Sequence, residues 1–473
     1  MKTSESIKEQ TLATTGLNGS FFVSVTVQLS SLEPETVLAN PPSSVRGFWQ
    51  SGPHWIAYAG SVAEIDSRER HHGTQRTLFQ WVSESAEKLY ESNWVLDRDG
   101  DLCRPRLHGG MAFDRCTPDD AEPGFWEVFP EARFTLPAFE VEADGSGARL
   151  TVTRQFPGDM PRDQAIDALR HRTSRTREHL LELERKGAVS SSVPSATALA
   201  EPVGVEFWSQ GVNRILKEIS RGNVRKVVLA RPLDVTLAEV PDSVSVLAAL
   251  RTANPLSHVY LRQFARDRFL LGAAPELICS LHDDVFHTMA VGGSTPRGAD
   301  PESDGWLGRQ LLGSHKNRVE HTIVVEDIIK HLSEVGINME ELPAPALLRL
   351  PRIQHLRTDL HASVPSETSI ISLIEALHPT AAVCGEPGTV ALDILNEEEL
   401  VGRGWYAGPV GWFDAAGNGE FAPALRSAVC RGPLLRLFAG SGIVSGSRPL
   451  AEWDETRVKF QTMLDALGVA RVP

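Results

Sequence analysis

The sequence has few cysteines, no long apolar run and no excess of positive charge. Its cysteines are odd in number and none stands in a Cys-x-x-Cys pair, so neither a disulfide framework nor a zinc site is expected. These cysteines are Cys103, Cys116, Cys279, Cys384 and Cys430. Glycine, proline or charge interrupts every apolar stretch, which excludes an ordinary membrane span. The N-terminal segment also lacks the cationic start and apolar stretch of a signal peptide. We therefore expect a soluble, cytoplasmic protein with reduced thiols.

Positive charge is scarce, because 47 Lys and Arg residues stand against 61 Asp and Glu residues, for a formal net charge of −14. This balance argues against general nucleic-acid binding, which needs a cationic surface. An anionic small substrate remains possible for such a chain. It would need a locally basic pocket or a metal ion inside an otherwise acidic protein.

The 473 residues divide into two regions that meet at a soft break. Residues 1–186 have the alternation and turn signals of short strands and end in a charge-rich helix over 162–186. Residues 187–202 are rich in serine, alanine and proline, which indicates a linker or loop. Residues 203–473 mix helical and strand patterns without a regular βαβ rhythm. The expected class is α+β.

The last helix carries three charged residues on one face. Glu452, Glu455 and Lys459 are spaced i, i+3 and i+7, and Phe460 belongs to the apolar stripe beside them. Taken alone, this pattern favours a solvated face. The alternative is half of a magnesium site, because carboxylates suit that hard cation. Glu320, in the first turns of a second helix, is a weaker carboxylate candidate.

Lys226 and Glu276 each stand beside an apolar strand. Alone, Lys226 at the start of the segment KVVLAR is more typical of a solvated lysine, and Glu276 of a surface glutamate. If they were buried, desolvation would lower the pKa of the lysine and raise that of the carboxyl. A neutral lysine and a protonated carboxyl could then act as general base and general acid.

Glycine-rich turns could bind an anion through backbone N–H groups. They occur at 291–298 (VGGSTPRG), at 440–442 (GSG) and after His378, at Gly385. None of them matches a Walker A or dinucleotide fingerprint. Each alone is best interpreted as a structural turn.

The order of these segments is more specific than any one of them. From Val203 to Leu467 the chain carries, in order, KVVLAR, PEL, GGSTPRG, VEH, HPTAAVCG, GPVGW, LFAGSGIV and ExxETxxK. This series resembles the chorismate-utilising enzymes, a family that includes anthranilate, aminodeoxychorismate, salicylate and isochorismate synthases. The resemblance implies one large α+β fold of stacked antiparallel sheets flanked by helices. In the first region only the segment HGGMAF is similar to the family.

The resemblance also implies roles for individual residues. Glu320 and Glu455 would bind Mg²⁺ directly and Glu452 through water, whereas Asn317 stands where the family often has an acidic residue. The groups implied to contact chorismate are Lys459, Gly440, Ser441 and Gly442 for its carboxylates, Arg426 and Tyr406 on the pyruvyl side, and Ser294, Thr295 and His378 in the pocket.

The resemblance also indicates which reaction of the family to expect. Lys226 would activate a water that attacks ring carbon 2, and Glu276 would protonate the hydroxyl that leaves carbon 4. The ammonia-using members resemble one another in lacking this lysine. Salicylate synthases carry Thr where this chain has Ala382 and Arg where it has Phe438. The prediction is therefore an isochorismate synthase serving menaquinone or siderophore synthesis, an isomerase working as a monomer without a glutamine amidotransferase subunit.

Three alternatives stay open at this point. A salicylate synthase would also eliminate pyruvate from isochorismate. A catalytically silent relative would bind chorismate as a subunit or regulator. An acidic scaffold without a ligand would show no magnesium-dependent response to chorismate.

Overall fold

The computed structural model describes residues 19–30, 32–39, 43–70, 76–92, 94–98, 105–114, 124–187, 192–339 and 342–469. Within them the strands are β1 (Ser20–Leu29), β2 (Arg46–Ser51), β3 (His54–Asp66), β4 (Trp94–Arg98), β5 (Arg106–Met111), β6 (Ala132–Ala143), β7 (Ala148–Pro157), β8 (Ala196–Ala200), β9 (Lys226–Leu237), β10 (His258–Ala265), β11 (Arg268–Ala274), β12 (Cys279–His282), β13 (Val285–Pro296), β14 (Ala346–Arg349), β15 (Ile353–Ser363), β16 (Gly385–Glu386), β17 (Pro409–Asp414), β18 (Gly419–Pro423), β19 (Ser427–Arg431) and β20 (Leu434–Ile443). The α-helices are α1 (Pro34–Ala39), α2 (Leu78–Tyr90), α3 (Arg162–Lys186), α4 (Val205–Ser220), α5 (Ser243–Ala253), α6 (Pro301–Gly313), α7 (His315–Glu334), α8 (Ile370–Leu377), α9 (Gly388–Glu398) and α10 (Pro449–Ala466).

One continuous ladder of strand pairs runs through the molecule and returns toward its start. From β9 it passes through β20, β19, β11, β10, β2, β3 and β6, and then through β5, β17, β18, β12, β13, β15 and β14. These pairs are all antiparallel, and the pair β1–β4 is parallel. The three largest of four clusters of buried apolar side chains fill the space between the layers and beneath the helices.

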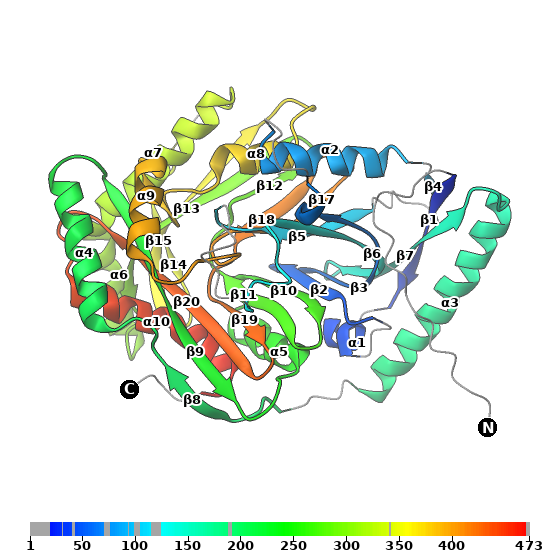
Figure 1. The fold of residues 1–473 in the computed structure, drawn as a ribbon, viewed down its shortest axis with the longest axis horizontal. Helices are drawn as coiled ribbons and strands as arrows, with labels where there is room; N and C mark the ends of the chain where they lie inside the picture. The colour runs from blue at the N-terminus through cyan, green and yellow to red at the C-terminus, as the bar shows by residue number, and fades with distance from the viewer. Residues whose placement is uncertain are drawn as a thin grey trace.

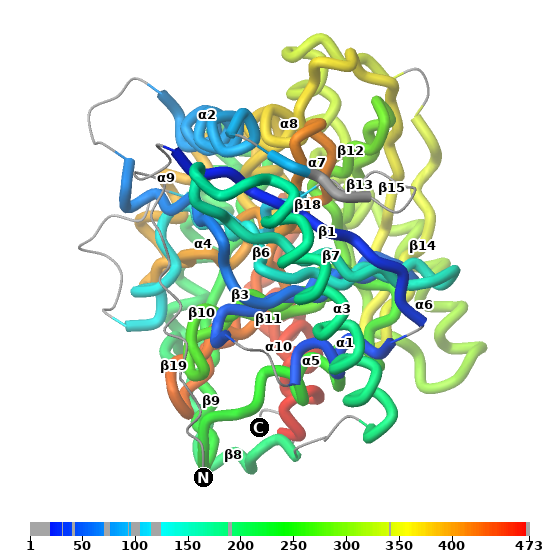
Figure 2. The backbone as a smooth tube through the Cα atoms, turned by 90° about the vertical axis from the view of Figure 1, so that its right-hand side faces the viewer, coloured from blue at the N-terminus to red at the C-terminus, as the bar shows by residue number. Residues whose placement is uncertain are grey.

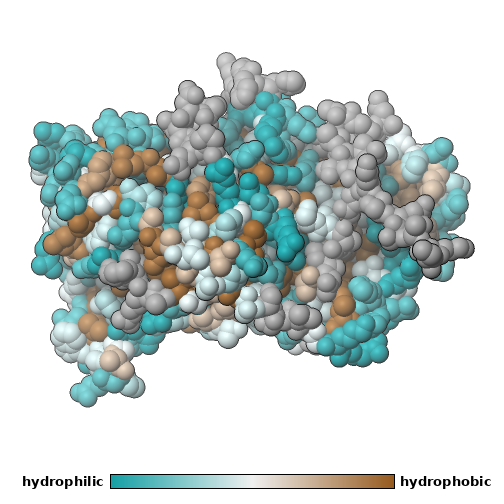
Figure 3. All heavy atoms as spheres, turned by 60° about the horizontal axis from the view of Figure 1, so that its bottom comes forward, coloured by the Kyte–Doolittle hydropathy of each residue, from teal (hydrophilic) through white to brown (hydrophobic). Residues whose placement is uncertain are grey.

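Helices cover the outside of this ladder (Figure 1). Helices α2 and α8 lie side by side along one edge, and α3 forms the far side of the molecule beside β1 and β7 (Figure 2). Helix α7 packs on β13 and α10 packs on β20, so each helix covers one end of the ladder. In the face shown in Figure 3, hydrophilic residues gather at the left and lower right edges, and apolar residues are visible in separate patches between them.

The two sequence regions are parts of one sheet system. Strand β2 pairs with β10, and β5 pairs with β17, which joins residues before 187 to residues after 202. The segment 187–202, which we expected to be a linker or loop, contains β8, and β8 pairs with β9 through a ladder whose register shifts once.

Helical periodicity was a reliable guide to this fold. The helix expected over 162–186 spans Arg162–Lys186. The described cysteines, Cys279, Cys384 and Cys430, are free and buried, whereas Cys103 and Cys116 lie outside the described residues. Among the described residues, no helix is long and apolar enough to cross a membrane.

Candidate active site

The two ends of the ladder enclose a cavity of about 80 Å³. Strands β9 and β20 form one wall, and the segment Val291–Ser294 of β13 forms another. Twelve residues that the sequence nominated line this cavity: Lys226, Glu276, Ser294, Glu320, Ala382, Tyr406, Arg426, Phe438, Gly440, Gly442, Glu455 and Lys459. They come from segments far apart in the chain, and the return of the ladder brings them together.

Lys226 is the first residue of β9 and is only 1% exposed. The strand is buried along most of its length because β20 pairs with it on one side and β16 pairs with its first residues on the other. The interpretation of Lys226 as a solvated lysine is therefore wrong. Burial lowers the pKa of its amine, although the nearby carboxylates of Glu320 and Glu276 act in the opposite direction.

Glu276 lies in the same cavity and is 5% exposed. Burial raises the pKa of its carboxyl to about 8, although Lys226 and Lys459 both favour the charged form. A carboxyl with this pKa is largely protonated at pH 7 and can donate a proton. Lys226 and Glu276 are thus shifted in opposite directions, each toward its neutral form.

Three lysine–glutamate pairs occupy the side of the site nearest α7 and α10: Lys226 Nζ with Glu320 Oε1 at 3.7 Å, Lys316 Nζ with Glu452 Oε1 at 2.7 Å, and Lys459 Nζ with Glu455 Oε1 at 2.6 Å. Burial raises the pKa of Glu455, but Lys459, Ser294 and Lys316 together outweigh this effect and lower the pKa to about 2. Burial raises the pKa of Glu320, and the neighbouring carboxylates Glu455 and Glu452 raise it further. The face predicted to be solvated is instead buried or half-buried.

The carboxylates suit a single hard cation. Glu320 and Glu455 line the cavity from different helices, and burial together with the negative charge of Glu455 raises the pKa of Glu320. A cation between the two carboxylates would offset this repulsion. Among the described residues, no group of three or more His, Cys, Asp or Glu side chains is arranged to hold a metal. Glu320 and Glu455 supply two carboxylates, a usual number for magnesium when substrate oxygens and water complete the shell.

Glycines keep strand β20 close to these charged groups. A Cβ at Gly442 would lie 2.9 Å from Lys226 Cε and closer still to Glu320 Oε1. A Cβ at Gly440 would meet Val228, Leu229 and the Tyr406 hydroxyl at 3.2–3.3 Å. The nitrogen of Lys459 donates a hydrogen bond to the Gly440 carbonyl at 2.9 Å, which places this cation at the cavity wall.

Part of the cavity wall is apolar. The rings of Tyr406 and Phe438 stack with their centroids 4.8 Å apart, and both line the cavity together with Ala382. Burial raises the pKa of Tyr406 to about 12, so its hydroxyl keeps its proton at neutral pH. This wall can exclude water from one side of a bound ring.

Four nominated residues do not line the cavity. Thr295 follows Ser294 in β13 and, by strand alternation, points away from it. Ser441 likewise alternates with its glycine neighbours and donates to Glu452 Oε2 at 2.6 Å. Glu452 is 2% exposed, with both oxygens bound by Ser441 and Lys316. His378 Nε2 is bonded to the Phe113 carbonyl at 2.9 Å.

Two polar side chains of this site were missed by sequence reasoning. His355 lines the cavity from β15, and Lys316 approaches it from the first turn of α7. Asn317, considered above for a role near the metal, donates its side-chain N–H to Ser314 Oγ at 2.9 Å and so contributes to the helix cap. The sequence could have indicated Lys316, because it lies one helical turn before Glu320 and therefore on the same face. The sequence carried no such signal for His355, because its place beside the glycine pair of β13 depends on strand register.

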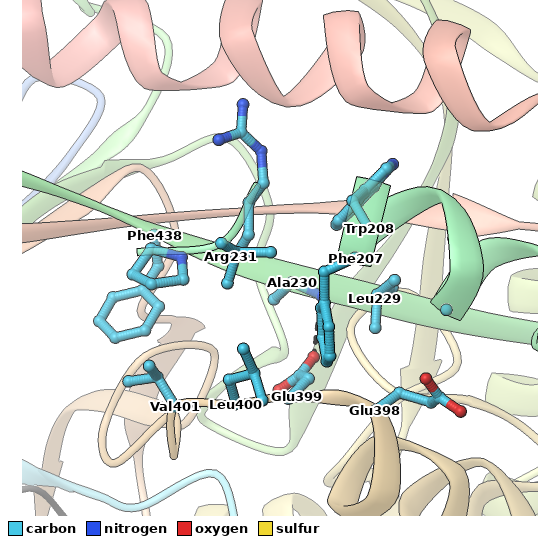
Figure 4. A pocket seen from close by; sticks show the side chains of 13 residues that line it. Phe207, Trp208, Leu229, Ala230, Arg231, Glu398, Glu399, Leu400, Val401 and Phe438 are labelled. Carbon is cyan, nitrogen blue, oxygen red and sulfur yellow. Dashed lines mark hydrogen bonds between the residues drawn. The ribbon is translucent and has the colours of Figure 1, made fainter. Parts of the chain in front are cut away.

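A second pocket lies next to the first and shares Phe438 with it (Figure 4). It holds only about 10 Å³. Its arginine, Arg231, points away toward α10, where Nε donates to Thr456 Oγ1 at 2.8 Å. Glu399, below the strand, accepts the Ala230 N–H at 2.8 Å. With its charged groups turned away or already bonded, this pocket is a poor candidate for the site.

Comparison with known proteins agrees with this architecture. The family model described as "Chorismate binding enzyme" matches residues 8–468. The isochorismate synthase MenF of Bacillus subtilis is 31% identical over 464 residues, covering 96% of this chain and 95% of that protein. The salicylate biosynthesis isochorismate synthase of Pseudomonas aeruginosa is 35% identical over 411 residues, covering 85% and 82%.

A solved structure shows the same fold. The menaquinone-specific isochorismate synthase MenF of Escherichia coli superimposes with a TM-score of 0.74 at 26% identity and covers 95% of each chain. The resemblance and the fold predicted from the ordered motifs are confirmed. The chain belongs to the family of chorismate-binding enzymes.

Proposed function

We propose that this protein is an isochorismate synthase, an isomerase that adds water to ring carbon 2 of chorismate and expels the hydroxyl of carbon 4. The observation that carries the proposal is a buried lysine, Lys226, in one cavity with a buried carboxyl, Glu276. The isochorismate synthases named above, similar to this chain over most of its length, support the same reaction.

Substrate binding in an acidic protein requires local positive charge. Chorismate is a dianion, and the cavity offers Lys459 and Arg426 together with the backbone of β20 at Gly440 and Gly442. In a buried site such groups act far more strongly than in water. We assign Lys459 and the β20 backbone to the carboxylates, and Arg426 with Tyr406 to the pyruvyl side.

The shifted proton states give each catalytic group a role. Lys226, with its lowered pKa, takes a proton from water as the oxygen bonds to carbon 2. The ring double bond moves, and the bond from carbon 4 to its hydroxyl breaks. Glu276, with its pKa near 8, gives its proton to that leaving oxygen. One water enters and one leaves, so the atoms of substrate and product balance.

The proposal includes magnesium. Glu320 and Glu455 would hold the ion, which would supply positive charge to offset and orient the ring carboxylate of chorismate. Glu452 would act at a distance, because Lys316 and Ser441 already bind its two oxygens.

Two positions set the expected product. Ala382 and Phe438 form part of the apolar wall, at the positions where salicylate synthases resemble one another in having Thr and Arg. We therefore propose that the reaction stops at isochorismate, for menaquinone or siderophore synthesis. A cytoplasmic location, and a monomer working without a glutamine amidotransferase subunit, are further parts of this proposal.

The test is to incubate the purified protein with chorismate and MgCl₂ and to identify the product by chromatography and mass spectrometry. Isochorismate is expected, and its formation should stop when EDTA is added. Salicylate with pyruvate would overturn the product assignment. Anthranilate formed with ammonium would overturn the role of Lys226 in selecting water, and chorismate binding without turnover would indicate a silent relative.

A further inference from the structure

Arg426 is a buried cation that forms no salt bridge with a carboxylate among the residues that the structure describes, although the charge of Glu455 acts on it from farther away. It is 8% exposed, lines the cavity and lies in a left-handed backbone conformation with φ 48°. Long flexible side chains lose much rotamer freedom when they are ordered, so an arginine that binds substrate needs something to hold its guanidinium in place. The surrounding contacts must supply that restraint.

His355 supplies such a contact. It is 5% exposed, lies on β15, and its Nε2 is 3.1 Å from Nη2 of Arg426. A guanidinium can only donate hydrogen bonds, so Nε2 must be the acceptor and the ring proton must sit on Nδ1. Nδ1 is 3.3 Å from the carbonyl oxygen of Gly293, to which it can donate. Both ring nitrogens are therefore used, and the tautomer is fixed.

A β-bulge turns the Gly293 carbonyl toward this ring. In the β13–β15 ladder, Gly292 opposes Leu356 and Ser294 opposes His355, so Gly293 is the extra residue between them. Its φ is 70°, and a Cβ there would lie 2.9 Å from Cβ of Asn317 on α7. The glycine is required by both its conformation and its contact. Helix α7 thus supports the bulge, the bulge supports His355, and His355 holds Arg426.

The imidazole remains neutral in this environment. Burial and, after it, the positive charges of Arg426 and Lys459 together lower the pKa of His355 to about 3. At pH 7 the ring therefore keeps the lone pair that accepts from Arg426.

We propose that His355 is a positioning residue that orients Arg426 for the pyruvyl side of the substrate through the acceptor Nε2. The inference deepens the proposed function and rests on it. His355 acts through Arg426 in this account and needs no contact with the reacting atoms. Its loss should therefore weaken chorismate binding more than it slows the chemical step.

Two amide substitutions separate the two hydrogen bonds. In His355→Asn the amide takes the place of Nδ1, so it can still reach Gly293 but not Arg426. In His355→Gln the amide end takes the place of Nε2 and can still accept from Arg426. His355→Met, of similar size, removes both bonds. The matched readouts are KM and kcat for chorismate at saturating Mg²⁺, together with the melting temperature of each variant.

The expected effect of each variant depends on whether it keeps the hydrogen bond to Arg426. KM should rise at least about tenfold in His355→Asn and His355→Met, with kcat changed only about threefold, and should stay near the wild-type value in His355→Gln. In an Arg426→Met background, His355→Asn should cause no further change, because the group it orients is absent. If the Met variant is not recovered folded, the Asn and Gln pair decides the question.

The results that would refute the positioning role of His355 differ from those that would refute the proposed function. If His355→Asn keeps the wild-type KM, or if its effect is undiminished in the Arg426→Met background, the positioning role is wrong. If Gln is impaired and Asn is not, the bond to Gly293 is the important one and the link to Arg426 is refuted. A wild-type protein that forms no isochorismate would instead overturn the proposed function.

Discussion

Gly442→Ala places one methyl group between the proposed base and a proposed metal ligand. The added Cβ would be 2.9 Å from Lys226 Cε and closer still to Oε1 of Glu320, whereas ordinary contacts between such atoms are about 3.5–4.0 Å. The Glu320 carboxylate must therefore move by on the order of 1 Å. A displacement of that size at reacting groups costs about a hundredfold in rate, or about 2.7 kcal/mol of transition-state stabilisation.

Gly440→Ala is the matched control on the same strand face. Its Cβ would meet Val228, Leu229 and Tyr406 at 3.2–3.3 Å, contacts that a few tenths of an ångström would relieve. Neither glycine has a positive φ, so alanine fits the backbone at both positions. Any large difference between the two variants must then come from what the methyl touches.

The assay is kcat/KM for isochorismate formation at saturating Mg²⁺, with thermal melting to show that each variant is folded. We expect a loss of about a hundredfold for Gly442→Ala and less than about tenfold for Gly440→Ala. A folded Gly442→Ala protein within threefold of wild type would refute the idea that Lys226 and Glu320 must keep this spacing. Equal losses in both variants would refute it as well, since they would indicate a general effect on β20.

The other predictions concern the catalytic pair and the metal. Lys226→Ala and Glu276→Gln should each lower kcat by at least about a hundredfold, and near-normal turnover in either would remove the acid–base assignment. The pKa of Glu276 rises from 4.5 to about 8 on folding, so its protonated form favours the folded state fully below pH 4.5 and that contribution is lost as the pH rises through 8. The free energy of unfolding of Glu276→Gln, relative to that of the wild type, should therefore increase between pH 5 and pH 8 by about 4–5 kcal/mol at most. If the two proteins differ by the same amount at both pH values, the raised pKa of Glu276 is contradicted. Magnesium with chorismate should raise the melting temperature more than either alone, and Glu320→Gln should abolish this joint effect, whereas an undiminished shift would place the ion elsewhere.

Local sequence patterns predicted the elements that carry the site but not the burial of its charges. The apolar stripe that includes Phe460 located α10, and this side chain is buried as expected. The same periodicity favoured a solvated face for Glu452, which is 2% exposed. Periodicity is a property of one helix, whereas this burial depends on β20 and on Lys316, which are distant in the sequence.

Lys226 and His355 show that local patterns in strands also fail to predict which polar side chains are buried. A lysine at the start of a strand is usually solvated, and only the pairing of β9 with both β20 and β16 covers this one. His355 stands in the segment QHLRTDL, where alternation cannot reveal which face meets a cavity. The bulge opposite it depends on the register between β13 and β15, which sequence reading did not establish. The ordered motifs of the family supplied the long-range information for Lys226 and supplied none for His355.

The most direct test of the central claim is the origin of the new hydroxyl oxygen. We would run the reaction with chorismate and Mg²⁺ in H₂¹⁸O and analyse the isochorismate by mass spectrometry under initial-rate conditions. Water activated by Lys226 should place one ¹⁸O on carbon 2 in each product molecule. Isochorismate formed at the wild-type rate without the label would mean that the hydroxyl is transferred within the substrate, and would contradict the role given to Lys226.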